Sequence, residues 1–336
     1  MSIDTRLNER LGVRHPILLA PMDVISGARL TAAVSLAGGF GILGGGYGNR
    51  DWLERELGQL KQPPADAGVP FGVGFITWSL AKQPGLLDVA LAAGPRAIML
   101  SFGAPELFGR CLKDAGALLI CQVQSEEIAN RALEAGADIL VAQGTEAGGH
   151  GAARAVMDIV PAIVDLAAGR VPVVAAGGIA DGRGLAASLM LGADGILMGT
   201  RFYASQEADG HDEAKKRICA ASADETIRGI IFDITRKNVW PPPFTGRCLV
   251  NDHVRRWAGR EAELLQNVDA VAAEYAAASA AGNFDIAAVI AGQAVGLIHD
   301  IPPAAEIIER IIAEGVRVLE DGRNSFAMSR HERSRH

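Results

Sequence analysis

The sequence lacks the cysteine patterns that build disulfide frameworks or metal sites. Its four cysteines, Cys111, Cys121, Cys219 and Cys248, lie far apart, with no CxxC pair and no metal-ligand spacing. This usage fits reduced thiols in a cytosolic protein better than a disulfide framework. The N-terminal residues begin no signal peptide, and no uncharged apolar run has membrane-spanning length. We therefore expect a cytoplasmic protein without a metal site or a membrane partner.

Basic stripes and the common nucleotide-binding motifs are also missing. The net charge is −7 and the basic residues form no stripe, which argues against nucleic acid as a partner. No GxGxxG opens the chain and no GxxxxGK[ST] occurs, so neither a Rossmann site nor a P-loop is expected. What the chain does have is 49% hydrophobic residues and 40 glycines spread between apolar runs, which indicates a large core and many tight turns.

Short apolar runs alternate with helical segments over the first 200 residues. Strands are expected over 17–20, 41–43, 71–76, 97–100, 117–123, 139–143, 171–176 and 196–198. Because they are apolar on both faces and separated by helices, they indicate an α/β protein with a parallel sheet covered by helices. Eight strands by residue 200 favour a closed (β/α)8 TIM barrel. A doubly wound open sheet is the alternative, which strand counting alone does not exclude.

The alternation stops after Thr200. We expect residues 1–205 to form the barrel and residues 206–302 to form a mostly helical insertion, without further strands, that lies over the barrel mouth as a lid. Residues 303–328 then supply the closing helix of the barrel, and residues 329–336 form a disordered tail. A helical appendage with no role at the mouth is the alternative for the insertion.

The last two predicted barrel strands end in small residues. They run into Ala176-Gly177-Gly178 and Met198-Gly199-Thr200. Ligands of such barrels bind over the C-terminal ends of the strands, and phosphate often binds after strands seven and eight. Backbone N–H groups at both ends can converge on one anion, helped by a helix N-terminus. We expect a phosphorylated ligand of the size of FMN; glycine in ordinary strand-to-helix turns is the plainer alternative.

The sixth predicted strand runs into a loop, residues 143–151, in which glycines flank His150. Glycine lets the backbone approach a ligand closely, and histidine changes protonation near neutral pH. His150 is the one histidine at a predicted strand end, so it is our candidate acid or base; a solvated turn is the alternative. Pro21 and Met22 end the first strand and suit the wall of a flat ring, although core packing explains Met22 equally well.

These segments resemble the nitronate monooxygenase family, formerly called 2-nitropropane dioxygenases. The resemblance is carried by Ala20-Pro21-Met22, Ala37-Gly38-Gly39-Phe40-Gly41, Pro70-Phe71-Gly72-Val73, Gln143-Gly144-Thr145-Glu146-Ala147-Gly148-Gly149-His150, residues 175–182 and Met198-Gly199-Thr200-Arg201-Phe202. It extends from about residue 10 to 205 and weakly through 292–298, and the EAGGH segment is its most specific part. It implies a TIM barrel with non-covalent FMN and His150 as the catalytic residue.

The physical reading and the resemblance together name the expected FMN contacts. These are Ala20, Pro21, Met22, Gly74, Gln122, Gln143, Gly148, Gly149, Ala176, Gly177, Gly178, Met198, Gly199 and Thr200. Two of them depart from the family pattern, because relatives often have Asn at the position of Gly74 and Lys at that of Gln122. A lysine near the ring favours anionic flavin by Coulomb attraction, and neutral glutamine lacks that effect.

The resemblance implies FMN-dependent oxidation of alkyl nitronates or nitroalkanes by O2 to a carbonyl compound and nitrite, with His150 as acid or base. Glu146 either orients His150 or is solvated. The main alternative is an NAD(P)H-dependent flavin reductase of the enoyl-acyl-carrier-protein or quinone reductase type. A barrel of the inosine-monophosphate dehydrogenase type would need a nucleophilic cysteine in the strand-six loop, which is absent. The third alternative is a non-catalytic protein that binds flavin.

Apolar residues of the insertion are expected to line either a pocket or a subunit contact. The candidates are Trp240, Phe244 and Trp257, with core packing expected for at least one of them. A homodimer is therefore compatible with the sequence, and the expected partners are otherwise a small-molecule substrate and O2.

Overall fold

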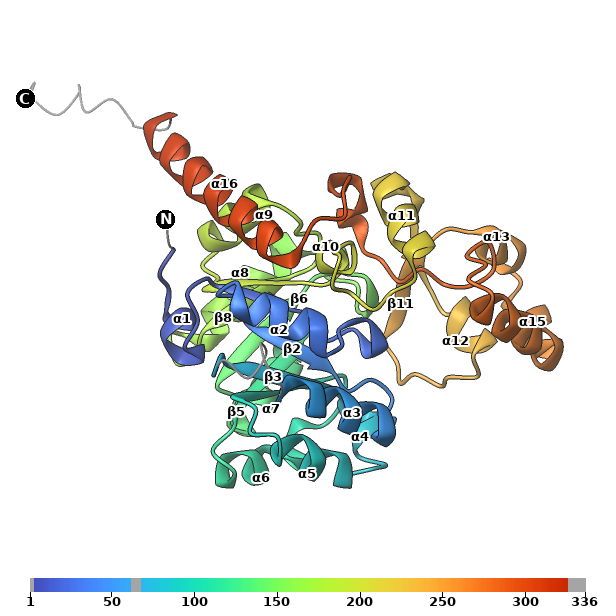
Figure 1. Cartoon of the computed structure of the whole chain (residues 1–336), viewed down its shortest axis with the longest axis horizontal. Coiled ribbons are helices and arrows are strands. Elements are labelled where there is room, and N and C mark those ends of the chain that lie inside the picture. Colours follow the sequence, from blue (N-terminus) through green and yellow to red (C-terminus); the bar gives the residue numbers. More distant parts are fainter. Residues whose placement is uncertain (1–2, 62–67, 326–336) are drawn as a thin grey trace, which may run out of the picture.

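The computed structural model describes residues 3–61 and 68–325 and contains one eight-stranded parallel sheet (Figure 1). In chain order its strands are β1 (Ile17–Leu19), β2 (Gly41–Gly44), β3 (Phe71–Ile76), β4 (Ala97–Ser101), β5 (Leu118–Val123), β6 (Ile139–Gln143), β8 (Val173–Ala176) and β9 (Gly195–Met198). They are arranged in the order β1-β9-β8-β6-β5-β4-β3-β2. The two ends meet, since Leu18 forms a parallel bridge with Phe40 and the Leu19 N–H donates to the Phe40 carbonyl at 3.0 Å. The predicted (β/α)8 barrel is therefore confirmed.

Helices follow the strands and cover the outside of the barrel. They are α2 (Ala28–Leu36), α3 (Arg50–Leu60), α4 (Thr77–Leu80), α5 (Gly85–Leu91), α6 (Gly109–Asp114), α7 (Glu126–Glu134), α8 (Val156–Ala167), α9 (Gly182–Met190) and α10 (Thr200–Tyr203), with 3-10 turns η1 (Asp23–Ile25) and η2 (Pro105–Leu107). Side-chain hydrogen bonds cap the N-termini of several of these helices. At the start of α3, for example, the Asn49 side chain accepts from the Trp52 N–H at 3.0 Å. The last helix, α16 (Ala304–Ser325), packs against α9 and α2 and takes the place of the eighth barrel helix.

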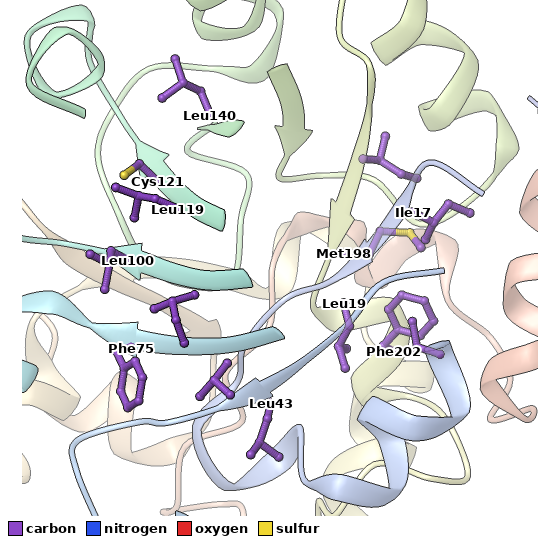
Figure 2. Close-up of a cluster of buried hydrophobic side chains, with 14 of the residues drawn as sticks. Ile17, Leu19, Leu43, Phe75, Leu100, Leu119, Cys121, Leu140, Met198 and Phe202 are labelled. Carbon is purple, nitrogen blue, oxygen red and sulfur yellow. The ribbon is translucent and has the colours of Figure 1, made fainter. Parts of the chain in front are cut away.

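Side chains of each strand alternate between the barrel interior and the helical layer. In β1, Leu18 points into the barrel, whereas Ile17 and Leu19 face the helices. Figure 2 shows the outer cluster, to which neighbouring strands contribute Leu43 and Leu100. The short helix α1 (Arg6–Leu11) adds its buried leucines to the inner cluster at the N-terminal ends of the strands. Because this end is closed by packing, space for a ligand is left at the opposite end.

The expectation that the insertion carries no strand was wrong. Residues 226–229 form β10 and residues 245–249 form β11, which pair antiparallel with each other. β11 also pairs with β7 (Gly149–Gly151), a short strand within the loop after β6. The insertion is thus joined to a barrel loop by a three-stranded sheet. The pattern was hard to see because each of these strands contains glycine, which strands disfavour.

Helices are nevertheless the commonest regular structure of the insertion and gather beside the barrel (Figure 1). They are α11 (Asp212–Ala220), α12 (Ile231–Thr235), α13 (Asp252–Trp257), α14 (Glu261–Gln266) and α15 (Val268–Ala280), with 3-10 turns η3 (Ala223–Glu225) and η4 (Gln293–Leu297). Their apolar side chains belong to two clusters, one of which also includes Ala180, Tyr203 and Ala204 of the barrel, and Trp257 is buried in the other. Core packing is therefore the role of Trp257.

The structure describes the predicted closing helix up to residue 325; residues 326–328 and the predicted disordered tail, 329–336, lie outside the described residues. No helix of residues 3–61 and 68–325 is long and apolar enough to cross a membrane. Within the same ranges, no three His, Cys, Asp or Glu side chains are grouped as ligands for a metal ion.

Candidate active site

A cavity of about 670 Å³ lies at the C-terminal ends of the barrel strands. Its volume is within the range of small-molecule and cofactor sites. Every residue predicted for the site lines it: Ala20, Pro21, Met22, Gly74, Gln122, Gln143, Gly148, Gly149, His150, Ala176, Gly177, Gly178, Met198, Gly199 and Thr200. The insertion lines it as well, among others through Asp233, Arg236 and Trp240. Barrel loops and insertion thus enclose one site.

The turns after β8 and β9 form a cradle of backbone donors. Gly177 and Gly178 have φ of 109° and 70°, in the region that L side chains rarely adopt. In the part of the chain that the structure describes, the N–H groups of Gly178, Gly199 and Thr200 donate to no protein acceptor. The Thr200 hydroxyl accepts from the Gly292 N–H at 2.9 Å, which brings the insertion to this turn. Unpaired donors on two adjacent turns fit an anionic phosphate.

Gly74 contributes backbone alone to the cavity wall. A Cβ atom at this position would lie 2.4 Å from the Cβ and 2.5 Å from the Cγ of Pro21. Carbon atoms make favourable contact at about 3.5–4.0 Å. Glycine is therefore required where Pro21 packs, and an asparagine could not occupy this position without moving the β1 end.

The predicted glutamines differ in how they are held. Gln143 accepts from the Gln124 amide at 2.8 Å and donates to the His150 carbonyl at 2.9 Å, so its amide fixes the loop after β6. Gln122 is buried at the end of β5 and has no such partner among the described residues. Its side chain is therefore the one of the two that is available to a ligand.

His150 lies in the middle of β7, opposite Gly246 of β11. Its Nε2 atom is 2.9 Å from Oδ2 and 3.1 Å from Oδ1 of Asp233, a residue of α12. The indole of Trp240 stacks on the imidazole with ring centroids 3.4 Å apart and an interplanar angle of 7°. Phe102 approaches the same imidazole edge-on. Two segments of the insertion therefore hold the histidine from its edge and its face.

Burial lowers the pKa of the His150 imidazole below its usual 6.5, and the hydrogen bond with Asp233 offsets part of this effect. The imidazole is thus neutral at pH 7 and able to accept a proton. A neutral imidazole carries one N–H, and Nε2 is the ring nitrogen that lies within hydrogen-bond distance of the Asp233 carboxylate.

A family model described as nitronate monooxygenase matches residues 4–314. The chain belongs to the nitronate monooxygenase family. It is 35% identical to a nitronate monooxygenase of Metarhizium robertsii, with 87% of this chain and 88% of that protein covered. It is 29% identical to an octahydro-indene-carboxyl-CoA dehydrogenase of Mycobacterium tuberculosis, with 95% and 98% covered. The structure of FabK from Thermotoga maritima superposes with a TM-score of 0.83 at 32% identity, with 96% and 100% covered. The protein is therefore an oxidoreductase of this family.

The loop after β6 is braced by two arginines of the insertion. Arg228 donates to the carbonyls of Thr145 and Ala147 at 2.9 and 3.0 Å, and Arg247 donates to that of Thr145 at 3.0 Å. Burial lowers the pKa of Arg228 to about 10, which leaves it charged at neutral pH. Hydrogen bonds from a charged group are stronger than neutral ones, so the backbone around His150 is rigidly placed.

Glu146, the carboxylate residue of the loop 143–151, forms no hydrogen bond with His150. Both of its carboxylate oxygens accept from the Val156 N–H at 3.1 Å, so it caps the start of α8. The idea that Glu146 orients the histidine was wrong, and Asp233 takes this position instead. Asp233 lies 83 residues after His150 in the chain, and no motif or spacing in the sequence connects the two.

Proposed function

We propose that this protein binds FMN in the cavity and oxidises alkyl nitronates or nitroalkanes with O2 to a carbonyl compound and nitrite. The observation that carries the proposal is that unpaired backbone donors and an open, neutral imidazole line the same cavity in a chain of the nitronate monooxygenase family. When bound, FMN supplies the electron transfer between substrate and O2 that no side chain performs.

The turns after β8 and β9 suit the phosphate of FMN. Gly178, Gly199 and Thr200 offer N–H groups, and their small size lets the phosphate approach the backbone. Pro21, Met22 and Gln122 would then border the ring, since they line the same cavity on β1 and β5. The Sδ atom of Met22 lies 3.4 Å from the position of a Cβ at Gly199, so the ring wall and the phosphate turn are in contact.

His150 is assigned the proton transfer. Its neutral imidazole receives the proton from the carbon that carries the nitro group of a neutral nitroalkane. Arg236 is the one Lys or Arg among the described residues that line the cavity, and it offers positive charge to the negative oxygens of a nitronate. Trp240 and Phe102 cover the imidazole and limit access of water to it.

Residues 206–302 are assigned the role of a lid. Residues as far apart as Asp209, Trp240 and Ala288 line the cavity from the insertion side. The site is therefore incomplete without this segment. This supports a lid that takes part in ligand binding and argues against a helical appendage with no role at the barrel mouth.

An absorbance spectrum followed by anaerobic mixing tests the proposal. The purified protein should show a flavin spectrum, and the flavin should be reduced by propyl-2-nitronate or propionate-3-nitronate without O2. Subsequent admission of O2 should yield nitrite. A colourless protein that does not take up added FMN would exclude the cofactor assignment, and oxidised flavin after nitronate addition would exclude the reaction.

A flavin reductase that takes hydride from NAD(P)H is the second candidate. It is favoured by the similarity over nearly the whole chain to a mycobacterial protein named as a dehydrogenase. The same anaerobic experiment separates the two activities, because rapid bleaching by NADH and none by nitronate is expected of the reductase alone.

A further inference from the structure

We propose that Asp233 is a positioning residue that holds the His150 imidazole as the tautomer whose Nδ1 faces the cavity as a base. The inference rests on the proposed proton transfer and deepens it. It also makes the insertion, and not the barrel alone, responsible for the state of the base.

The geometry of the pair supports this role. The Asp233 carboxylate approaches Nε2 with both oxygens, at 2.9 and 3.1 Å, and the two side chains are 7% and 10% exposed. At such distances and so little exposure, the carboxylate must receive a hydrogen bond, since an unsatisfied buried charge is strongly unfavourable. The proton therefore lies on Nε2, and the lone pair on Nδ1.

The other ring nitrogen is left open. Nδ1 of His150 has no hydrogen-bond partner among the described residues, and it is not among their fully buried polar atoms that lack one. His150 lines the cavity, so Nδ1 is reached from there. A base needs this arrangement: one nitrogen tied to the protein and the other free to take the substrate proton.

Asp233 is itself held in place. Its backbone carbonyl accepts from the Asn238 N–H at 2.8 Å, and a guanidinium nitrogen of Arg236 lies 3.7 Å from Oδ1. On the face of the imidazole, the stacked Trp240 indole limits tilting of the ring. The carboxylate and the indole therefore define both the direction and the plane of the imidazole.

Three charged groups shift the pKa of the imidazole. Asp233 raises the pKa of His150, whereas Arg236 and Arg228 lower it, in addition to the lowering by burial. In Asp233→Asn the amide keeps the shape but loses the negative charge, and its NH2 group can donate to Nε2. The other tautomer then becomes accessible, and the histidine pKa falls further.

Nitrogen NMR of the histidine side chains is the decisive experiment. The FMN-loaded protein is labelled with ¹⁵N-histidine and studied at pH 8 without substrate, with His150→Gln to assign the signal. The unaltered protein should show Nε2 protonated and Nδ1 unprotonated, and Asp233→Asn should show a mixture or the reverse. A matched control is Asp269→Asn, which removes an exposed carboxylate of α15 that pairs with Lys237 at the surface, and should leave the His150 signal unchanged.

Kinetics give the second readout. Asp233→Asn should lower kcat at least about 10- to 100-fold, the effect known for carboxylates that orient metal-bound histidines, with little change in KM or FMN content. The acid limb of the pH profile should move to lower pH, and Asp233→Glu should restore part of kcat. An unchanged tautomer and an unchanged acid limb in Asp233→Asn would overturn the inference. Because the NMR signal requires no turnover, it remains interpretable if the reaction is assigned wrongly.

Discussion

The contact between Gly74 and Pro21 allows a sharp test of the cavity wall. In Gly74→Ala, the added Cβ would lie 2.4 Å from the Pro21 Cβ, more than 1 Å inside the usual contact distance of about 3.5–4.0 Å. Either β3 or the Ala20-Pro21-Met22 segment must move. Overpacking of this kind costs about 1–3 kcal/mol. Part of that strain should appear as lost cofactor affinity, because the segment that moves forms the proposed ring wall.

The full 1–3 kcal/mol would correspond to a rise of about 5- to 150-fold in the Kd for FMN, which sets the upper bound of the expected effect. Flavin fluorescence titration of the apoprotein measures this Kd, and urea denaturation measures the free energy of unfolding. Gly58→Ala is the matched control, since a Cβ at this exposed position of α3 meets nothing within 4 Å. The control should bind FMN normally and be equally or more stable. Wild-type FMN affinity in Gly74→Ala would refute the argument that this contact shapes the site.

Three further perturbations test the rest of the site. His150→Ala should keep its FMN but lose most turnover of neutral nitroalkanes. In the wild type, activity should fall at low pH as the base is protonated, with a midpoint below the usual 6.5 because burial lowers the pKa of His150. Full turnover in His150→Ala with this acid limb intact would contradict the base assignment. Gly178→Val places a branched side chain at φ 70°, which costs about 1–2 kcal/mol, and the purified variant should contain no flavin. The control Gly116→Val has the same backbone strain at φ 72° but meets no other atoms, so it should keep its flavin. Arg236→Gln should raise KM for a nitronate about tenfold while leaving KM for the neutral nitroalkane nearly unchanged, and an equal effect on both would argue against charge recognition.

The barrel was predictable because its signal is local. Runs such as Phe71–Ile76 and Ile139–Gln143 are apolar on both faces and bounded by turns, and the structure has strands at these residues. The glycines after β8 and β9 could be assigned to a ligand site because strand order alone places them side by side. All predicted site residues line one cavity, while their contact with a cofactor remains a prediction.

The partners of His150 could not be predicted in this way. Asp233 and Trp240 reach the imidazole through the fold of the insertion, and nothing in their local sequence marks them. β10 has four residues, all half-buried, and contains a single large apolar side chain, Ile227, so the run is too short to stand out as an alternating strand. Glu146 was misleading for the opposite reason, since proximity in sequence to His150 suggested a contact that its capping of α8 prevents.

The pairing of β7 with β11 has a consequence for engineering. Residues 149–151 belong to the barrel by sequence, but their hydrogen-bonded partners are residues 245–247. Exchange of the insertion between relatives, as a route to new substrates, would therefore replace β11, the strand that pairs with the backbone of His150. A chimera that transplants both halves of this ladder together should retain an ordered imidazole, whereas one that transplants a single half should not.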